Sequence, residues 1–123
     1  MREVPSWDQY FMEIAKVVAT RSKDPVTQVG AILVDQSNRI IGTGYNGMKA
    51  GVIESETLWS KPIKKRYVVH AEMNAILNAV KEVRGSTLYV TLKPCPECGK
   101  LIGAAGIKKV FYLTSRSYVI EPD

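Results

Sequence analysis

One histidine and two cysteines are the only residues of their kinds among the 123 residues of the chain. His70 and the pair Cys95 and Cys98 each stand where the surrounding pattern predicts the start of a helix. A helix N-terminus carries a partial positive charge and free N–H groups, so it lowers the pKa of a nearby thiol and favours metal binding. If the three side chains form one site, the fold has to bring two separate helix starts together.

These three side chains suit zinc at a catalytic site. Catalytic zinc usually takes three protein ligands and leaves a fourth position for water, whereas structural zinc takes four protein ligands. No further histidine or cysteine is present to complete a structural site. Glu72 lies two residues after His70, in the first turn of the expected helix, where its carboxylate can exchange protons with a water at the metal.

Other interpretations of the same residues stay open. A lone histidine is more often structural than metal-bound, and a lone C-x-x-C can be a redox pair or one half of a structural zinc site. The redox interpretation leaves His70 and Glu72 without a role. A zinc-stabilised binding module without catalysis is a further alternative, against which the carboxylate of Glu72 argues.

The first half of the chain predicts a helix followed by a hairpin. A helix over 6–21 opens with a capping box formed by Ser6 and Gln9. Its apolar residues repeat at helical spacing and are Trp7, Tyr10, Phe11, Ile14, Val17 and Val18. Two β-rich runs, 28–35 and 39–45, predict a hairpin, and 46–66 is expected to be a long surface loop that includes a helical turn.

The second half predicts a strand, a crossover helix and a strand. A helix over 71–83, ended by Gly85, is marked by Met73, Ile76, Leu77 and Val80. A strand over 87–92, a helix over 94–106 and a strand over 109–113 follow, which implies a parallel pair with a right-handed crossover. The expected fold is α/β, a three-layer α/β/α sandwich with a mixed sheet, in a single domain over 1–123.

Composition and charge indicate the kind of partner and the cellular compartment to expect. Lys and Arg number 17 against 12 Asp and Glu, and the net charge of +5 favours an anionic partner such as a nucleotide phosphate or nucleic acid. The N-terminal residues lack the apolar region of a secretory signal, and no apolar run reaches the length of a membrane span. A cytoplasmic protein without a membrane partner is expected, since a lone C-x-x-C suits a reducing compartment.

A longer motif connects these residues to a known family. His70-Ala71-Glu72, followed by Pro94-Cys95-Pro96-Glu97-Cys98, matches the H-x-E and P-C-x-x-C signature of zinc-dependent deaminases. From about Trp7 to Leu113 the chain resembles the deoxycytidylate deaminases of the cytidine deaminase superfamily. The segments that carry this resemblance are Ser22-Lys23-Asp24-Pro25, Thr27-Gln28-Val29-Gly30-Ala31, Gly44-Tyr45-Asn46-Gly47, Met73-Asn74-Ala75-Ile76 and Ala105-Gly106-Ile107-Lys108.

The resemblance implies a cytidine deaminase-like fold and a hydrolase that converts dCMP to dUMP with release of ammonia, supplying dUMP for thymidylate synthesis. His70, Cys95 and Cys98 would hold one catalytic zinc per chain. Water activated by that zinc would attack C4 of cytosine, while Glu72 would protonate N3 and then the departing ammonia. Relatives with a second zinc carry it in the loop before the His-Ala-Glu helix, but residues 47–69 contain no cysteine or histidine.

The resemblance and the residue chemistry also suggest substrate contacts. Asn46 matches the family position that hydrogen-bonds the deoxyribose hydroxyl, although it can also be interpreted as a turn asparagine in the left-handed conformation. The backbone N–H of Ala71, at a helix start, is an expected donor to the pyrimidine O2. Candidates for phosphate contacts, chosen for hydroxyls and cations, are Ser22, Lys23, Ser117 and Tyr118.

Regulation is implied by the resemblance as well. Family members with the Gly-Tyr-Asn-Gly turn are commonly regulated by end-product nucleotides, so a homohexamer activated by dCTP and inhibited by dTTP is expected. The expected allosteric residues are Gly44, Tyr45, Gly47 and Lys49, with Mg²⁺ bridging the triphosphate oxygens. Basic residues of the same long loop that could support the site are Lys61, Lys64, Lys65 and Arg66.

A second class of enzyme also fits the zinc signature, and the chain differs from its relatives in the expected number of strands. A tRNA adenosine deaminase shares the zinc signature but needs an extended basic or aromatic surface for an RNA loop. The Gly-Tyr-Asn-Gly turn and Met73-Asn74-Ala75-Ile76 favour the nucleotide enzyme, so nucleic acid is not expected as a partner. Relatives usually continue into a fifth strand and a further helix, whereas four strands are expected here before Asp123.

Overall fold

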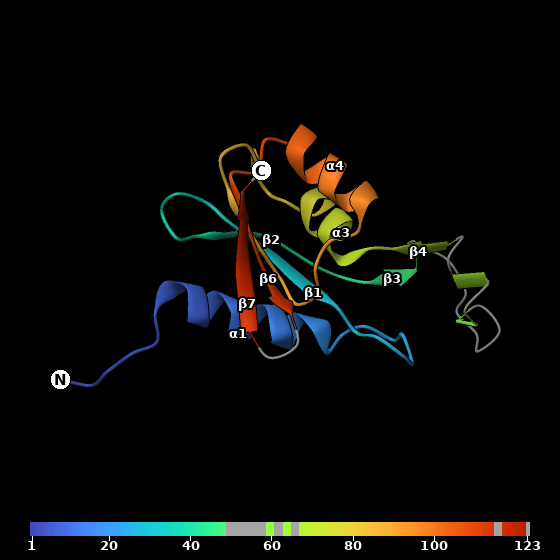
Figure 1. Ribbon diagram of the computed structural model, residues 1–123, viewed down its shortest axis with the longest axis horizontal. Coiled ribbons are helices and arrows are strands. Elements are labelled where there is room, and N and C mark those ends of the chain that lie inside the picture. The colour runs from blue at the N-terminus through green and yellow to red at the C-terminus, as the bar shows by residue number, and fades with distance from the viewer. Residues whose placement is uncertain (49–58, 61–62, 65–66, 115–116, 123) are drawn as a thin grey trace.

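The computed structural model describes residues 1–48, 59–60, 63–64, 67–114 and 117–122. Within these residues one helix covers one face of a mixed sheet and two helices cover the other (Figure 1). This arrangement confirms the three-layer α/β/α architecture expected from the sequence. None of the helices in these ranges is long and apolar enough to cross a membrane.

The described elements are three helices and seven strands. The helices are α1 (Trp7–Ala19), α3 (Ala71–Leu77) and α4 (Pro96–Ala104). The strands of the main sheet are β1 (Gly30–Val34), β2 (Ile40–Tyr45), β5 (Thr87–Val90), β6 (Lys109–Thr114) and β7 (Ser117–Pro122). Two short strands, β3 (Gly47–Met48) and β4 (Val68–Val69), pair antiparallel with each other.

The strand order of the main sheet is β2-β1-β5-β6-β7, and it brings distant segments together at one end of three adjacent strands. β1 is antiparallel to both β2 and β5, with Gly30 opposite Tyr45 and Ala31 opposite Val90. The start of β1, the end of β2 and the end of β5 therefore meet. β5 and β6 form the expected parallel pair, with α4 between them in the chain.

Alternation along the strands divides the core between the two faces of the sheet. Ile32 and Val34 of β1 face α1, whereas Ala31 and Leu33 face α3 and α4. The α1 side is completed by Phe11, Met12, Ala15, Tyr89 and Phe111. On the other side, the helices contribute Ala71, Ala75, Cys98 and Ile102. A residue of the expected metal site is thus also a core residue.

The buried stripe of α1 differs from the expected one. The capping box of Ser6 and Gln9 is present, but Trp7 is 57% exposed and Val17 is exposed as well. The helix instead presents Ala15 and Ala19 to the sheet, so closely that a Cβ on Gly30 would lie 2.0 Å from the Ala15 carbonyl oxygen. This close approach requires small residues at the contact, and Phe11 and Met12 pack beside it, so the buried stripe is displaced from the one that includes Trp7 and Val17.

The expected end of the second helix and the expected number of strands in the main sheet are wrong. The helix expected over 71–83 ends at Leu77, and the backbone N–H of Val80 donates to the Ile41 carbonyl, 2.9 Å away. That bond to the neighbouring strand replaces the helical one, and Val80 is 84% exposed. A fifth strand is also present, since β7 pairs antiparallel with β6.

The expected surface loop is only partly described. Its first residues form β3, which contradicts the loop assignment at Gly47 and Met48. The backbone N–H groups of Ile63 and Lys64 both donate to the Ser60 carbonyl, as expected for a helical turn. Residues 49–58, 61–62 and 65–66 lie outside the described residues.

Candidate active site

Each expected ligand lies at a helix N-terminus, as the sequence predicted. His70 is the N-cap of α3 and has an extended backbone, with φ −68° and ψ 154°. Cys95 is the N-cap of α4, where its Sγ accepts a hydrogen bond from the Cys98 backbone N–H, 3.4 Å away. Pro96 begins that helix, a position at which the missing N–H costs nothing.

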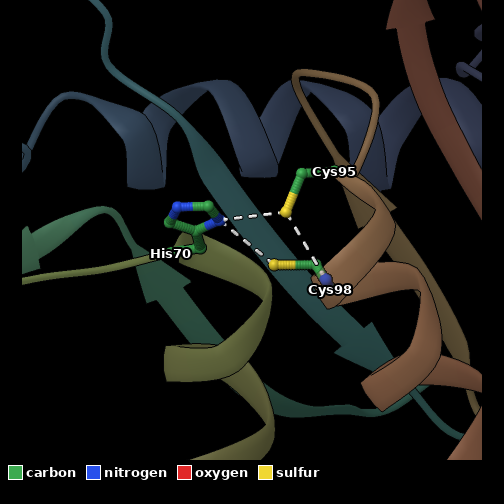
Figure 2. A group of neighbouring side chains, drawn as sticks. All are labelled: His70, Cys95 and Cys98. Atoms are coloured by element: carbon green, nitrogen blue, oxygen red, sulfur yellow. Dashed lines mark hydrogen bonds between the residues drawn. The ribbon is translucent and has the colours of Figure 1, made fainter. Parts of the chain in front are cut away.

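The three side chains point toward one another across the two helix starts (Figure 2). Nδ1 of His70 lies 3.2 Å from Sγ of Cys98 and 3.5 Å from Sγ of Cys95. All three candidate ligand atoms lie within 4.8 Å of one another. One imidazole nitrogen and two sulfurs at this spacing form a donor set that suits a tetrahedral zinc with one position left for water.

The surroundings of Cys98 disfavour a thiolate and outweigh the pKa-lowering effect expected from the helix start. Burial, the nearby Glu72 carboxylate and Cys95 all raise the pKa of the Cys98 thiol, because each disfavours a thiolate at this position. A divalent cation held by the three ligands would reverse this effect by stabilising the thiolates. No fourth histidine or cysteine joins the cluster in the described part of the chain, which supports an open catalytic site over a closed structural one.

Glu72 is the acid–base candidate of the site. It lies in the first turn of α3 and is only 4% exposed. Burial raises the pKa of its carboxyl group, and this effect outweighs the opposing influence of its own backbone N–H, His70 and Cys98. A buried carboxyl group beside the candidate metal ligands is placed to exchange protons with a water at the metal.

A cavity of about 310 Å³ opens beside these residues. It forms where the start of β1 and the ends of β2 and β5 meet the start of α3. The lining residues are Asp24, Thr27, Val29, Asn46, Lys64, Val68, His70, Ala71, Glu72, Leu92, Lys93 and Cys95. Ala71 and Glu72 are buried, whereas Thr27, Leu92 and Lys93 are exposed, so the cavity has a buried floor and an open mouth. Ala71 and Asn46, which were expected to contact the substrate, both line this cavity.

Asn46 is held in one orientation. Its Oδ1 accepts a hydrogen bond from the Val29 backbone N–H at 2.8 Å, and its Nδ2 donates to the Thr27 carbonyl at 2.9 Å and to Asp24 Oδ2 at 3.3 Å. The interpretation of Asn46 as a left-handed turn residue is wrong. Among the described non-glycine residues a positive φ occurs only at Asn38, in the β1–β2 turn.

The pair formed by Asp24 and Lys64 was not predicted as part of the site. Nζ of Lys64 lies 2.8 Å from Oδ2 and 3.1 Å from Oδ1 of Asp24. Burial opposes ionisation of Asp24, but Lys64 and the backbone N–H groups of Val26 and Thr27 outweigh it, so the pKa of Asp24 is lowered. Asp-Pro after a helix could have indicated the turn. Nothing local indicates the lysine, which comes from a distant segment.

Ser22 and Lys23, two of the expected phosphate residues, do not line this cavity. The Ser22 hydroxyl donates to the Asn46 carbonyl at 2.8 Å and does not line the cavity. Lys23 lines a second, smaller cavity. Ser117 and Tyr118 belong to β7, where their backbones pair with Thr114 and Leu113, and their side chains lie outside the description. A phosphate contact by these four residues stays a prediction.

Two of the expected allosteric residues line a second cavity, one packs against α3, and one lies outside the described residues. Tyr45 and Gly47 line the second cavity, about 90 Å³ in volume, together with Arg21, Lys23, Met48 and Trp59. Gly44 instead packs against the backbone of α3. Lys49 lies outside the described residues, as do Lys61, Lys65 and Arg66. Lys64 lines the main cavity.

The site and fold together define a class. A mixed α/β domain that holds one imidazole and two thiols at helix N-termini, beside a buried carboxylate, has the arrangement of a zinc-dependent deaminase. Residues 5–114 match the model of the cytidine and deoxycytidylate deaminase zinc-binding region. The chain belongs to this family.

Within this family, the chain is similar to several deoxycytidylate deaminases. It is 48% identical over 133 residues to a probable deoxycytidylate deaminase of Drosophila melanogaster and 44% identical over 117 residues to the deoxycytidylate deaminase of Homo sapiens. These matches cover 98% and 89% of this chain but 65% and 66% of the relatives, so the chain spans slightly less than two thirds of their length. A crystal structure of the dCMP deaminase from cyanophage S-TIM5, in complex with dCMP and dUMP, matches with 33% identity and a TM-score of 0.76. It covers 90% of this chain and 83% of that one.

Proposed function

We propose that the protein hydrolyses dCMP to dUMP and ammonia. The observation that carries this proposal is the convergence of His70, Cys95 and Cys98 beside the buried Glu72, which lines the same cavity as His70 and Cys95. The similarity to deoxycytidylate deaminases, including one crystallised with dCMP and dUMP, supports the choice of substrate.

The chemistry follows from the placement of Glu72. A zinc held by His70, Cys95 and Cys98 would act as a Lewis acid that makes water nucleophilic at neutral pH. The Glu72 carboxylate accepts a proton from the attacking water and delivers it to N3 of the cytosine ring. It then passes the second proton to the amino group at C4, which leaves as ammonia. One water is consumed, and the ring carries a carbonyl at C4.

Binding contacts follow from the same cavity. The backbone N–H of Ala71, in the first turn of α3, belongs to the free donors of a helix start and is proposed to bind the pyrimidine O2. Oδ1 of Asn46 accepts one hydrogen bond from Val29 and retains a second lone pair, which is proposed to accept from the deoxyribose hydroxyl. The fixed orientation of Asn46 means that little side-chain order is lost when substrate binds.

The decisive assay compares potential substrates on the purified, zinc-loaded protein. Release of ammonia and the absorbance change are followed with dCMP, deoxycytidine, dCTP and a tRNA anticodon stem-loop. Fastest turnover of dCMP is expected. Preferential turnover of the stem-loop would favour a tRNA adenosine deaminase, and no turnover with bound zinc would favour a binding module.

Regulation is proposed to accompany this activity, in a cytoplasmic homohexamer that supplies dUMP for thymidylate synthesis. The second cavity supports an allosteric site, because Arg21 and Lys23 lie there beside Tyr45 and Gly47. Activation by dCTP and inhibition by dTTP require that each nucleotide prefers a different conformation of the chain. The test is dCMP saturation with each triphosphate plus Mg²⁺, combined with sedimentation. Unchanged hyperbolic curves, or a monomer at assay concentration, would contradict this part.

A further inference from the structure

The two lysines that line the main cavity have different partners. Lys64 is paired with the buried carboxylate of Asp24, and its side chain is only 17% exposed. Lys93 has no carboxylate partner among the described residues; its Nζ lies 5.7 Å from the centre of the Tyr112 ring. An aromatic face attracts an ammonium group without neutralising it. The positive charge of Lys93 is therefore available to a ligand.

Lys93 lies at the open mouth of the cavity, toward which the phosphate of a bound nucleotide would extend. Ala71 and Glu72 form the buried floor beside His70 and Cys95, and the reacting end of a cytosine ring has to reach this part of the cavity. The sugar and phosphate then extend toward the mouth. Thr27 and Lys93 are exposed cavity residues there, one with a hydroxyl group and one with three N–H donors.

A cation at the cavity mouth would offset the charge of a phosphate. Asp24 and Glu72 both line the cavity, and an ionised carboxylate without a partner would repel a phosphate dianion. Lys64 compensates Asp24 but is occupied by that contact. We propose that Lys93 binds the 5′-phosphate of the substrate at the cavity mouth and so selects nucleoside monophosphates over nucleosides. This assignment rests on the proposed deamination of dCMP.

The test compares two substrates that differ only by the phosphate. Lys93→Gln is expected to lower kcat/KM for dCMP by about tenfold, mainly through KM, because it removes one charge-assisted hydrogen bond. Deoxycytidine turnover should not change, and Lys93→Arg should retain most of the dCMP preference. Lys100→Gln is the matched control, since Lys100 is an exposed lysine of α4 outside the cavity.

The outcomes separate the two proposals. Unchanged dCMP kinetics in Lys93→Gln, or equal losses on both substrates, would overturn the assignment of Lys93 and leave the deaminase proposal intact. If the unaltered protein does not turn over dCMP, the deaminase proposal fails, and calorimetric binding of dUMP and deoxyuridine decides about Lys93. A preference for dUMP that Lys93→Gln abolishes would support the assignment, whereas an unchanged or absent preference would overturn it.

Discussion

Gly44 of β2 lies directly against the backbone of Ala71 in α3: a Cβ on Gly44 would be 2.4 Å from the Ala71 carbonyl oxygen. The same Cβ would be 2.3 Å from the Ala75 amide nitrogen. Both contacts are with helix backbone, which cannot turn aside as a flexible side chain can. The absence of a side chain at position 44 therefore sets how close α3 approaches the sheet, and with it the positions of His70 and Glu72.

Gly44→Ala is expected to displace α3 from the sheet and to destabilise the protein by about 1–3 kcal/mol, the usual cost of overpacking. Zinc affinity and turnover should fall as well, because the ligands at the start of α3 move relative to α4. Thermal unfolding and zinc titration measure these effects. Gly103→Ala is the control: no neighbouring atom lies within 4 Å of its Cβ position, and a helical alanine should stabilise by about 0.5–1 kcal/mol. Equal behaviour of both variants would contradict the packing role.

One tightly bound zinc per chain is expected, and Cys95→Ser or Cys98→Ser should abolish it, since each removes one of three ligands. Metal analysis of the purified protein after dialysis measures the stoichiometry. Glu97→Gln, an exposed change in the first turn of α4, should keep its zinc. Two zincs per chain, or active protein without any, would be inconsistent with this site.

Glu72→Gln should keep the fold and the zinc but lose nearly all turnover. The amide has almost the same shape as the carboxylic acid, yet it cannot accept and return a proton. Parallel measurements of kcat, metal content and melting temperature separate chemistry from structure. Glu82→Gln, an exposed carboxylate outside the cavity, serves as the control. Appreciable turnover by Glu72→Gln would remove Glu72 from the mechanism.

Asn46→Ala should reduce both stability and dCMP turnover. The side chain makes hydrogen bonds to Val29, Thr27 and Asp24 in a buried position, and leaving such partners unsatisfied costs about 1–3 kcal/mol. Asn78→Ala is a matched control, because Asn78 is exposed and its Nδ2 lies 3.4 Å from the Thr43 carbonyl. Urea unfolding and steady-state kinetics give the two quantities. Unimpaired kinetics in a destabilised variant would limit Asn46 to a structural role.

The ion pair of Asp24 and Lys64 predicts a specific pH dependence of stability. The pKa of Asp24 is lower in the folded state, so its contribution is fully present above the unfolded value of about 3.9 and is lost as the pH falls through the folded value. The free energy of unfolding of the unaltered protein should therefore fall toward that of Asp24→Asn as the pH decreases below about 4. The difference between the two proteins, measured by urea unfolding across this range, cancels effects that they share. Glu97→Gln, from an exposed ion pair, should show no comparable difference. A pH-independent difference for Asp24→Asn would contradict the assignment.

The members of the metal site could be predicted because a position at a helix start is a local feature, whereas the meeting of the two helix starts depends on the fold. His70, Glu72, Cys95 and Cys98 occur at spacings that place them at two helix starts, and the structure confirms both starts. The capping box, the hairpin and the parallel pair were predictable for the same reason, because hydrogen-bonding side chains and residue periodicity act over a few positions. The sequence by itself thus determined the ligand set, the acid–base candidate and the layered fold.

The shape of the cavity depended on tertiary structure. The meeting of Asp24, Asn46 and Lys64 joins three segments that are distant in the chain, and no spacing rule predicts which polar side chains will pair. The end of α3 at Leu77 was decided by the bond between Val80 and Ile41 of a neighbouring strand. The buried face of α1 was decided by the close contact of Ala15 with Gly30. Each of these contacts forms between segments that are far apart in the chain. Its strength depends on a distance in the folded protein, and the sequence pattern around either residue does not give that distance.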